Sequence, residues 1–112
     1  MSKRTFYHQE LAAGRWRELS FFEQMANVGS EIERTIKWRE KNEEFSRLAF
    51  ERGLELLDLT IADPKNRDRL KELTRVREAL VDYFMFANEY GSSDKLWRNY
   101  FYGFNYAARL GL

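Results

Sequence analysis

Apolar residues recur along this chain at intervals of three and four, the spacing that places them on one side of an α-helix. The pattern predicts four helices, over about 20–41, 43–62, 64–90 and 94–109. No segment alternates apolar and polar residues in the way of a half-buried strand. Short connections make consecutive helices antiparallel neighbours, so we predict an all-α, up-down four-helix bundle.

Residues with strong capping preferences mark where these helices begin and end. Ser20 is followed three residues later by Glu23, which is the form of a capping box. Asp63 precedes Pro64, and this pair predicts a helix start because Asp accepts hydrogen bonds from first-turn amides and Pro lacks an N–H there. The same helix is expected to end near Gly91, since glycine adopts the left-handed conformation that closes helices.

The length of 112 residues fits one compact domain. We assign residues 1–17 to a polar N-terminal tail and residues 18–112 to a single helical-bundle domain. The longest apolar run of the tail, 11–13, is too short for a signal-peptide core, and no window approaches the roughly 18 apolar residues that cross a bilayer. The expected location is therefore the cytoplasm, with no membrane association.

Several kinds of chemistry are excluded by composition. The chain has no cysteine and one histidine, His8, so thiolate metal sites, thiol nucleophiles and paired imidazoles cannot be built. The Glu-x-x-His pattern of di-metal bundles is absent. We therefore expect no metal, no cofactor and no catalytic residue. Nineteen basic against eighteen acidic residues give a formal charge of +1, which offers little attraction to a polyanion.

Two charged residues fall on apolar rows of the predicted helices and require partners. Asp58 lies among leucines of the second helix, and Arg77 lies among apolar residues of the third. If the chain reverses directly at residues 63–64, the level opposite Asp58 is near residue 69 or 70. Arg69 is then the expected ion-pair partner of Asp58, and Arg77 is expected to pair elsewhere or to line a cleft.

The last predicted helix carries a basic and aromatic row on its outer side. Arg98, Tyr102, Asn105 and Arg109 recur by four, three and four, with Tyr106 alongside. Such side chains stack on unpaired bases and are also enriched in protein interfaces. An ordinary solvent-exposed face has the same composition. Because the net charge is low, we favour a protein interface over RNA for this row.

Two family resemblances accompany these patterns. Residues 16–109, including FFEQMANVGSE at 21–31 and LTRVREALVDYF at 73–84, resemble a family of short uncharacterised bacterial helical proteins, which implies no particular activity. The segment REALVDYF at 77–84 is also similar to the motif of HEPN domains, which are four-helix bundles of toxin–antitoxin and defence systems that commonly dimerise.

The HEPN resemblance bears on catalysis. Active HEPN domains pair an Arg and a following polar residue with a His four to six positions later, and this pair cleaves RNA across the dimer cleft. Arg77 and Glu78 match the first two positions, whereas Asp82 stands in place of the His. The resemblance thus implies an inactive bundle that binds a nucleotidyltransferase-type protein or RNA.

We therefore predict a non-catalytic interaction module, either a homo-oligomer or the subunit of a small complex. The alternative is a HEPN-like toxin–antitoxin or RNA-acting protein centred on Arg77. The candidate partner-binding or RNA-binding residues are Arg77, Asp82, Arg98, Tyr102, Asn105, Tyr106 and Arg109.

Overall fold

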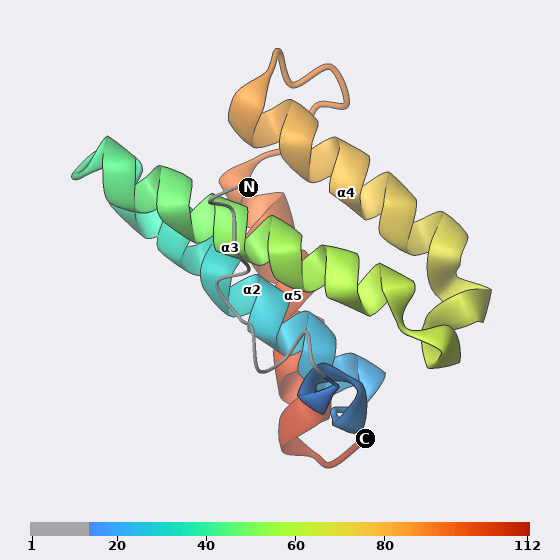
Figure 1. Cartoon of the computed structure of the whole chain (residues 1–112). Coiled ribbons are helices and arrows are strands. Elements are labelled where there is room, and N and C mark those ends of the chain that lie inside the picture. Colours follow the sequence, from blue (N-terminus) through green and yellow to red (C-terminus); the bar gives the residue numbers. More distant parts are fainter. Residues whose placement is uncertain (1–13) are drawn as a thin grey trace, which may run out of the picture.

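A computed structural model describes residues 14–112 of the chain (Figure 1). This part contains four α-helices and two short 3₁₀-helices, and no strand. The elements in chain order are η1 (Arg15–Glu18), α2 (Phe21–Trp38), α3 (Glu43–Ala62), η2 (Pro64–Arg69), α4 (Leu70–Met85) and α5 (Asp94–Arg109). The predicted all-α, four-helix architecture is confirmed.

Contacts near the helix ends show that neighbouring helices run in opposite directions. Ser46, early in α3, donates a hydrogen bond to the backbone carbonyl of Thr35, late in α2, whereas Gln24, early in α2, bonds Asp63 just after α3. The other neighbouring helices are antiparallel as well. Helices α3 and α4 meet at Phe50–Phe84 and at Asp58–Arg77, and α4 and α5 meet at Tyr83–Asp94 and at Glu72–Tyr100. Helices α2 and α5 meet at Phe21–Phe104 and at Arg39–Asp94.

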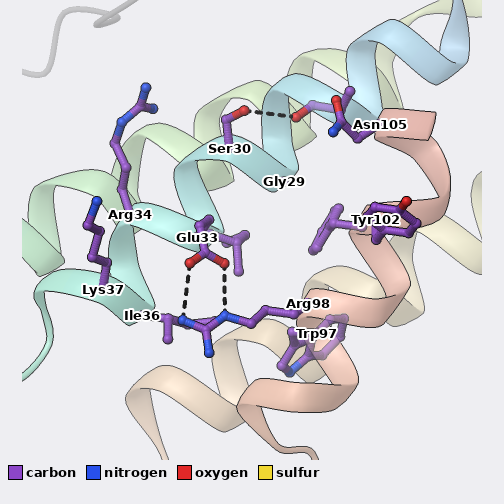
Figure 2. Close-up of a pocket in the computed structure, with 13 residues that line it drawn as sticks. Gly29, Ser30, Glu33, Arg34, Ile36, Lys37, Trp97, Arg98, Tyr102 and Asn105 are labelled. Carbon is purple, nitrogen blue, oxygen red and sulfur yellow. Dashed lines mark hydrogen bonds and ion pairs between the residues drawn. The ribbon is translucent and has the colours of Figure 1, made fainter. Parts of the chain in front are cut away.

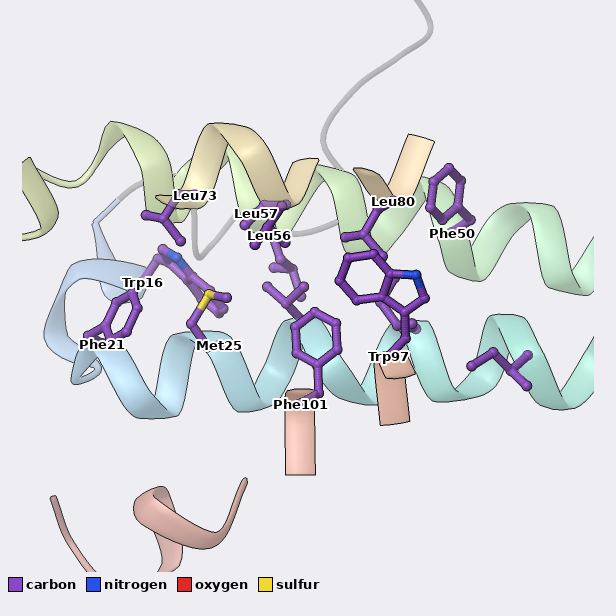
Figure 3. Close-up of a cluster of buried hydrophobic side chains, with 14 residues drawn as sticks. Trp16, Phe21, Met25, Phe50, Leu56, Leu57, Leu73, Leu80, Trp97 and Phe101 are labelled. Carbon is purple, nitrogen blue, oxygen red and sulfur yellow. The ribbon is translucent and has the colours of Figure 1, made fainter. Parts of the chain in front are cut away.

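The core lies between the facing sides of these helices (Figure 3). Helix α2 contacts both α3 and α5 extensively, while α4 makes its most extensive helix contact with α3. Trp97 and Phe101 project from α5 toward the space between α2 and α3 (Figure 3). The buried apolar side chains that form this core cluster are Trp16, Phe21, Met25, Val28, Ile32, Ile36, Phe50, Leu56, Leu57, Leu73, Val76, Leu80, Trp97 and Phe101.

The predicted starts of three helices are confirmed. Ser20 and Glu23 form the reciprocal capping box that precedes α2, and Asn42 caps α3 through its side-chain oxygen. Helix α5 has the predicted bounds, with Ser93 as its cap. Helix α2 ends at Trp38 and not at residue 41, because the chain turns between residues 39 and 42.

The predicted helix over 64–90 is wrong at both ends. Its first six residues form η2, with Asp63 as cap, and its α-helical part ends at Met85. Asp82 explains the early end, because its carboxylate accepts hydrogen bonds from the backbone N–H groups of Glu89 and Tyr90 at 2.8 and 3.0 Å. Asn88 adopts a left-handed φ of 56°, which turns the chain away from the helix axis.

The predicted boundary of the N-terminal tail is also wrong. Trp16 lies in η1, is 2% exposed, and donates a hydrogen bond from its indole nitrogen to the Thr60 hydroxyl at 3.1 Å. The fold therefore includes the last residues of the expected tail. His8 lies outside the described residues. Among residues 14–112, no helix has the length and apolar composition needed to cross a membrane.

A buried polar network joins α2 to the turn between α3 and η2. The side-chain nitrogen of Gln24 donates to the carbonyl of Trp16 and to the Asp63 carboxylate, at 2.9 and 2.8 Å. Asn66 donates to the side-chain oxygen of Gln24 and to the carbonyl of Thr60, both at 2.9 Å. Because each polar group finds a partner, the network fixes the turn without the cost of an unsatisfied buried group.

Candidate binding groove

A groove of about 590 Å³ runs between α2 and α5 (Figure 2). Its floor is apolar and includes Trp97 and Phe101, both of which belong to the core. Its rim is polar. From α2 the groove is lined by Ala26, Gly29, Ser30, Ile32, Glu33, Arg34, Ile36 and Lys37, and from α5 by Trp97, Arg98, Phe101, Tyr102 and Asn105.

Small residues of α2 explain why α5 can come so close. A Cβ atom added to Gly29 would lie 2.7 Å from the Cβ of Phe101, so only glycine fits at this crossing. Ala26 and Ser30 flank Gly29 along the groove and carry short side chains. The result is a close helix contact beside a hollow strip of surface.

An ion pair spans the groove. The Arg98 guanidinium binds both carboxylate oxygens of Glu33, at 2.9 and 3.1 Å, as Figure 2 shows. This hydrogen bond, reinforced by the negative charge of Glu33, raises the pKa of Arg98 above its ordinary value. Because both side chains are about half exposed, the pair contributes little to stability and chiefly fixes the orientation of Arg98.

The rim of the groove carries excess positive charge. Arg34 pairs with Glu31 at 3.2 Å, and Arg98 pairs with Glu33. Lys37 is exposed and has no ion-pair partner among residues 14–112. The groove therefore combines an apolar floor with a rim suited to an acidic or hydrogen-bonding surface.

Two exposed tyrosines continue the groove along α5. The Tyr102 and Tyr106 side chains are 58% and 51% exposed, and their rings stack with centroids 6.4 Å apart. Exposed, mutually ordered aromatic rings are typical of binding surfaces, since they offer contact area at a small cost in side-chain entropy.

The structure brings together three of the residues predicted on the outer row of the last helix. Arg98, Tyr102 and Asn105 line the groove, and Tyr106 stacks on Tyr102. Arg109 is exposed in the last turn of α5 and does not line it.

The structure places Arg77 and Asp82 in other interactions. Arg77 binds both carboxylate oxygens of Asp58, at 2.7 and 3.2 Å, and this hydrogen bonding raises the pKa of Arg77. Asp82 holds the loop after α4, as described above.

The expected pairing of Asp58 with Arg69 is wrong. The Arg69 guanidinium instead lies 4.0 Å from the centre of the Phe21 ring, a cation–π contact. The physical reason is η2, which inserts six residues between α3 and α4. This insertion shifts the level opposite Asp58 from residue 69 to residue 77.

Sequence reasoning missed the α2 side of the groove. Ala26, Ser30 and Lys37 belong to the polar side of α2, which periodicity assigns to solvent. The spacing of Ala26 and Ser30 beside Gly29 is a signal for close helix packing, but such spacing does not say which helix approaches.

A smaller hollow of about 290 Å³ lies on the other side of α2, toward α3. Phe45 contacts the Trp38 ring edge-on there, with centroids 5.4 Å apart, and is 51% exposed. Arg34 lines both this hollow and the groove, so the two lie on either side of one arginine. The remaining lining residues are Leu48, Ala49 and Arg52.

No set of three or more His, Cys, Asp or Glu side chains gathers into a metal-binding arrangement within residues 14–112. Comparisons of the chain with family models, curated proteins and solved structures found no match.

Proposed function

We propose that this protein is a non-catalytic, cytoplasmic interaction module that binds a protein through the groove between α2 and α5. The groove itself carries the proposal. It combines an apolar floor, a cationic rim and two exposed, stacked tyrosines, Tyr102 and Tyr106. These features match the composition of protein interfaces, in which aromatic residues and arginine are enriched.

The roles of the polar residues elsewhere support a non-catalytic function. Arg77 is held by Asp58, and Asp82 is held by loop amides. Asp94 accepts hydrogen bonds from Arg39 and from the Tyr83 hydroxyl, at 2.7 and 2.6 Å. Side chains that hold helices and loops in register are not available as an acid, a base or a nucleophile without loosening the fold.

Site-specific photo-crosslinking in the producing cell tests this function. A photoreactive phenylalanine analogue replaces Tyr102 in one variant and the exposed Lys71 of α4 in a matched control. We expect a discrete crosslinked protein from the Tyr102 variant and none from the Lys71 variant. Equal labelling from both positions, or none from Tyr102, would contradict the proposal.

The alternative function is an RNA-acting protein. It is supported by Arg98 beside the exposed tyrosines, because arginine and aromatic rings together bind unpaired bases. In this alternative Arg109 and Arg77 take part as well. The test is incubation with single-stranded RNA at low salt. RNA cleavage that Arg77→Ala abolishes would establish the enzyme, and salt-sensitive RNA binding that Arg98→Ala weakens would establish the RNA-binding module.

A further inference from the structure

We propose that the groove between α2 and α5 is occupied by a second copy of this chain, which inserts Phe45 and Leu48 of its α3. This inference rests on the proposed function and names the partner. It assigns the dimer to one face of the molecule, formed by α2 in the centre, α5 on one side and α3 on the other.

The projecting and the hollow parts of this face lie next to each other. Phe45 is 51% exposed although it is aromatic, and its main aromatic neighbour is Trp38. On the other side of Arg34 lies the groove, whose apolar floor includes Trp97 and Phe101 and whose rim is bridged by the exposed Glu33–Arg98 ion pair. One face therefore carries both an apolar projection and an apolar recess of the same chain.

The Phe45 side chain and the groove lie at similar levels along the axis of α2. Trp38 contacts Phe45 at the start of α3, and the adjacent Arg39 contacts Asp94 at the start of α5. The starts of α3 and α5 thus lie at one level, on opposite sides of α2. The groove extends from that level toward the middle of α5.

This arrangement is self-complementary under twofold symmetry. In a symmetric dimer, the surface of one copy that contacts the other is contacted in return by the same surface. A twofold axis that runs along α2 places the α3 side of each copy over the α5 side of the other, at the same level. Each copy then places its Phe45 in the groove of the other copy, so the dimer contains two identical contacts and gains the binding energy of both.

The charges of the two sides are complementary. On α3, the row next to Phe45 and Leu48 contains the exposed Glu44 and the partly exposed Glu51 and Glu55. Arg47 of the same helix pairs with Glu44 and with Glu51, both at 2.7 Å, so carboxylates outnumber guanidinium groups in this row but are already bound within the chain. The opposing side is basic and contains Lys37 of the rim together with Lys95 and Arg98 of α5. At matching levels, Glu44 of one copy approaches Lys37 of the other. An acidic row against a basic rim favours this docking over one that brings two α5 helices together.

The first experiment measures self-association of the purified full chain by sedimentation velocity. The concentration series runs from about 1 μM to about 100 μM, which covers weak and moderate dimers. We expect a monomer–dimer equilibrium, and we expect Phe45→Ala to raise the dimer dissociation constant about tenfold or more. The matched control is Phe86→Ala, which removes a 74% exposed ring from the loop after α4 and leaves the constant unchanged.

A charge exchange tests which surfaces meet. Lys37→Glu and Glu44→Lys each place like charges opposite one another in a homodimer, so each variant alone is expected to be monomeric. When the two variants are mixed, both contacts again join opposite charges, and a heterodimer is expected to form. Lys71→Glu, a charge reversal on α4, serves as the control and dimerises as the wild type does. Thermal melts confirm that all variants are folded.

The outcomes separate this inference from the proposed function. A wild-type monomer throughout the series, a dimer insensitive to Phe45→Ala, or a mixture that fails to reassociate overturns the second copy as occupant. In those cases a crosslink from Tyr102 to a protein of different mass still supports the interaction module. A crosslink that doubles the mass of the chain agrees with the dimer.

Discussion

At the scale of single residues, Trp16 closes one end of the core. Its ring is buried between η1 and the helices, and its indole N–H reaches Thr60. Truncation of a buried tryptophan removes apolar contacts and leaves a cavity, so we expect Trp16→Ala to lower the free energy of unfolding by about 3–5 kcal/mol. Urea unfolding followed by circular dichroism measures this loss.

Trp16→Phe is the matched control for that experiment. It keeps a six-membered aromatic ring, removes the N–H donor and leaves part of the indole volume empty, while the Thr60 hydroxyl retains its bond to the Leu56 carbonyl. The expected loss is smaller than for alanine, about 1 kcal/mol from the hydrogen bond together with part of the packing loss. A wild-type unfolding midpoint for Trp16→Ala would show that η1 does not contribute to the folded core.

The role of Trp16 was not predictable from periodicity. A single aromatic residue in a four-residue 3₁₀-helix produces no repeating pattern, so it reads as part of a polar tail. The partner of Asp58 was missed for a related reason. The Asp63–Pro64 pair does cap a helical segment, but that segment is a 3₁₀-helix of six residues and the α-helix begins only at Leu70. The level of every later residue along α4 depends on this difference.

At the scale of helices, substitution of alanine for glycine is expected to have opposite effects on stability at Gly29 and at Gly103. Gly29 meets Phe101 at the crossing of α2 and α5, whereas Gly103 of α5 has no atom within 4 Å of an added Cβ. Gly29→Ala is expected to destabilise the protein, because overpacking costs about 1–3 kcal/mol and outweighs the gain in helix propensity. Thermal unfolding measures the change.

Gly103→Ala is expected to stabilise the folded chain by about 0.5–1 kcal/mol, the usual gain when alanine replaces glycine in an exposed helix interior. If both substitutions shift the melting temperature in the same direction, the close approach of α5 to Gly29 is wrong. Helix starts were predictable here because capping is local in sequence. This helix crossing was not, because the identity of the approaching helix is a property of the whole bundle.

At the scale of the whole molecule, two partly shielded carboxylates make stability depend on pH. Burial alone would raise the pKa of Asp63, but hydrogen bonds from Lys65 and Gln24 outweigh it and leave the pKa below 3.8. For Asp94, burial is likewise outweighed, here by Tyr83 and Arg39, and its pKa is lowered as well. Each carboxylate therefore binds its proton less readily in the folded state than in the unfolded state.

Because the folded pKa values lie below the unfolded ones, this stabilisation is fully present above about pH 4 and is lost as the pH falls through the folded values. Melts recorded between about pH 2 and pH 7 are expected to show falling stability below about pH 4. Asp63→Asn should lower stability at neutral pH and make its acid dependence shallower. An unchanged slope in that variant would contradict the role of Asp63.

The bundle architecture was predictable because composition and periodicity act over the whole chain. The groove was predictable only in part. The pattern of α5 identified Arg98, Tyr102 and Asn105, but Lys37 and Ser30 reach the same surface through the packing of α2. When two helices share a site, the sequence of each helix shows its own pattern of polar and apolar residues. Neither pattern reveals that the two helices lie side by side.

The four helices are packed into the core to different extents, so they differ in how readily they unfold locally. Helix α4 buries Leu73, Val76 and Leu80 and packs sparsely on α3, whereas α2 buries eight residues, and α5, which buries two, packs extensively on α2. Segments with few interior contacts unfold locally at the lowest free energy. Backbone amides of α4 will therefore exchange their hydrogens for deuterium earlier than those of α2. Each local opening of α4 exposes the part of the core around Leu80, while α2 and α5 remain packed together.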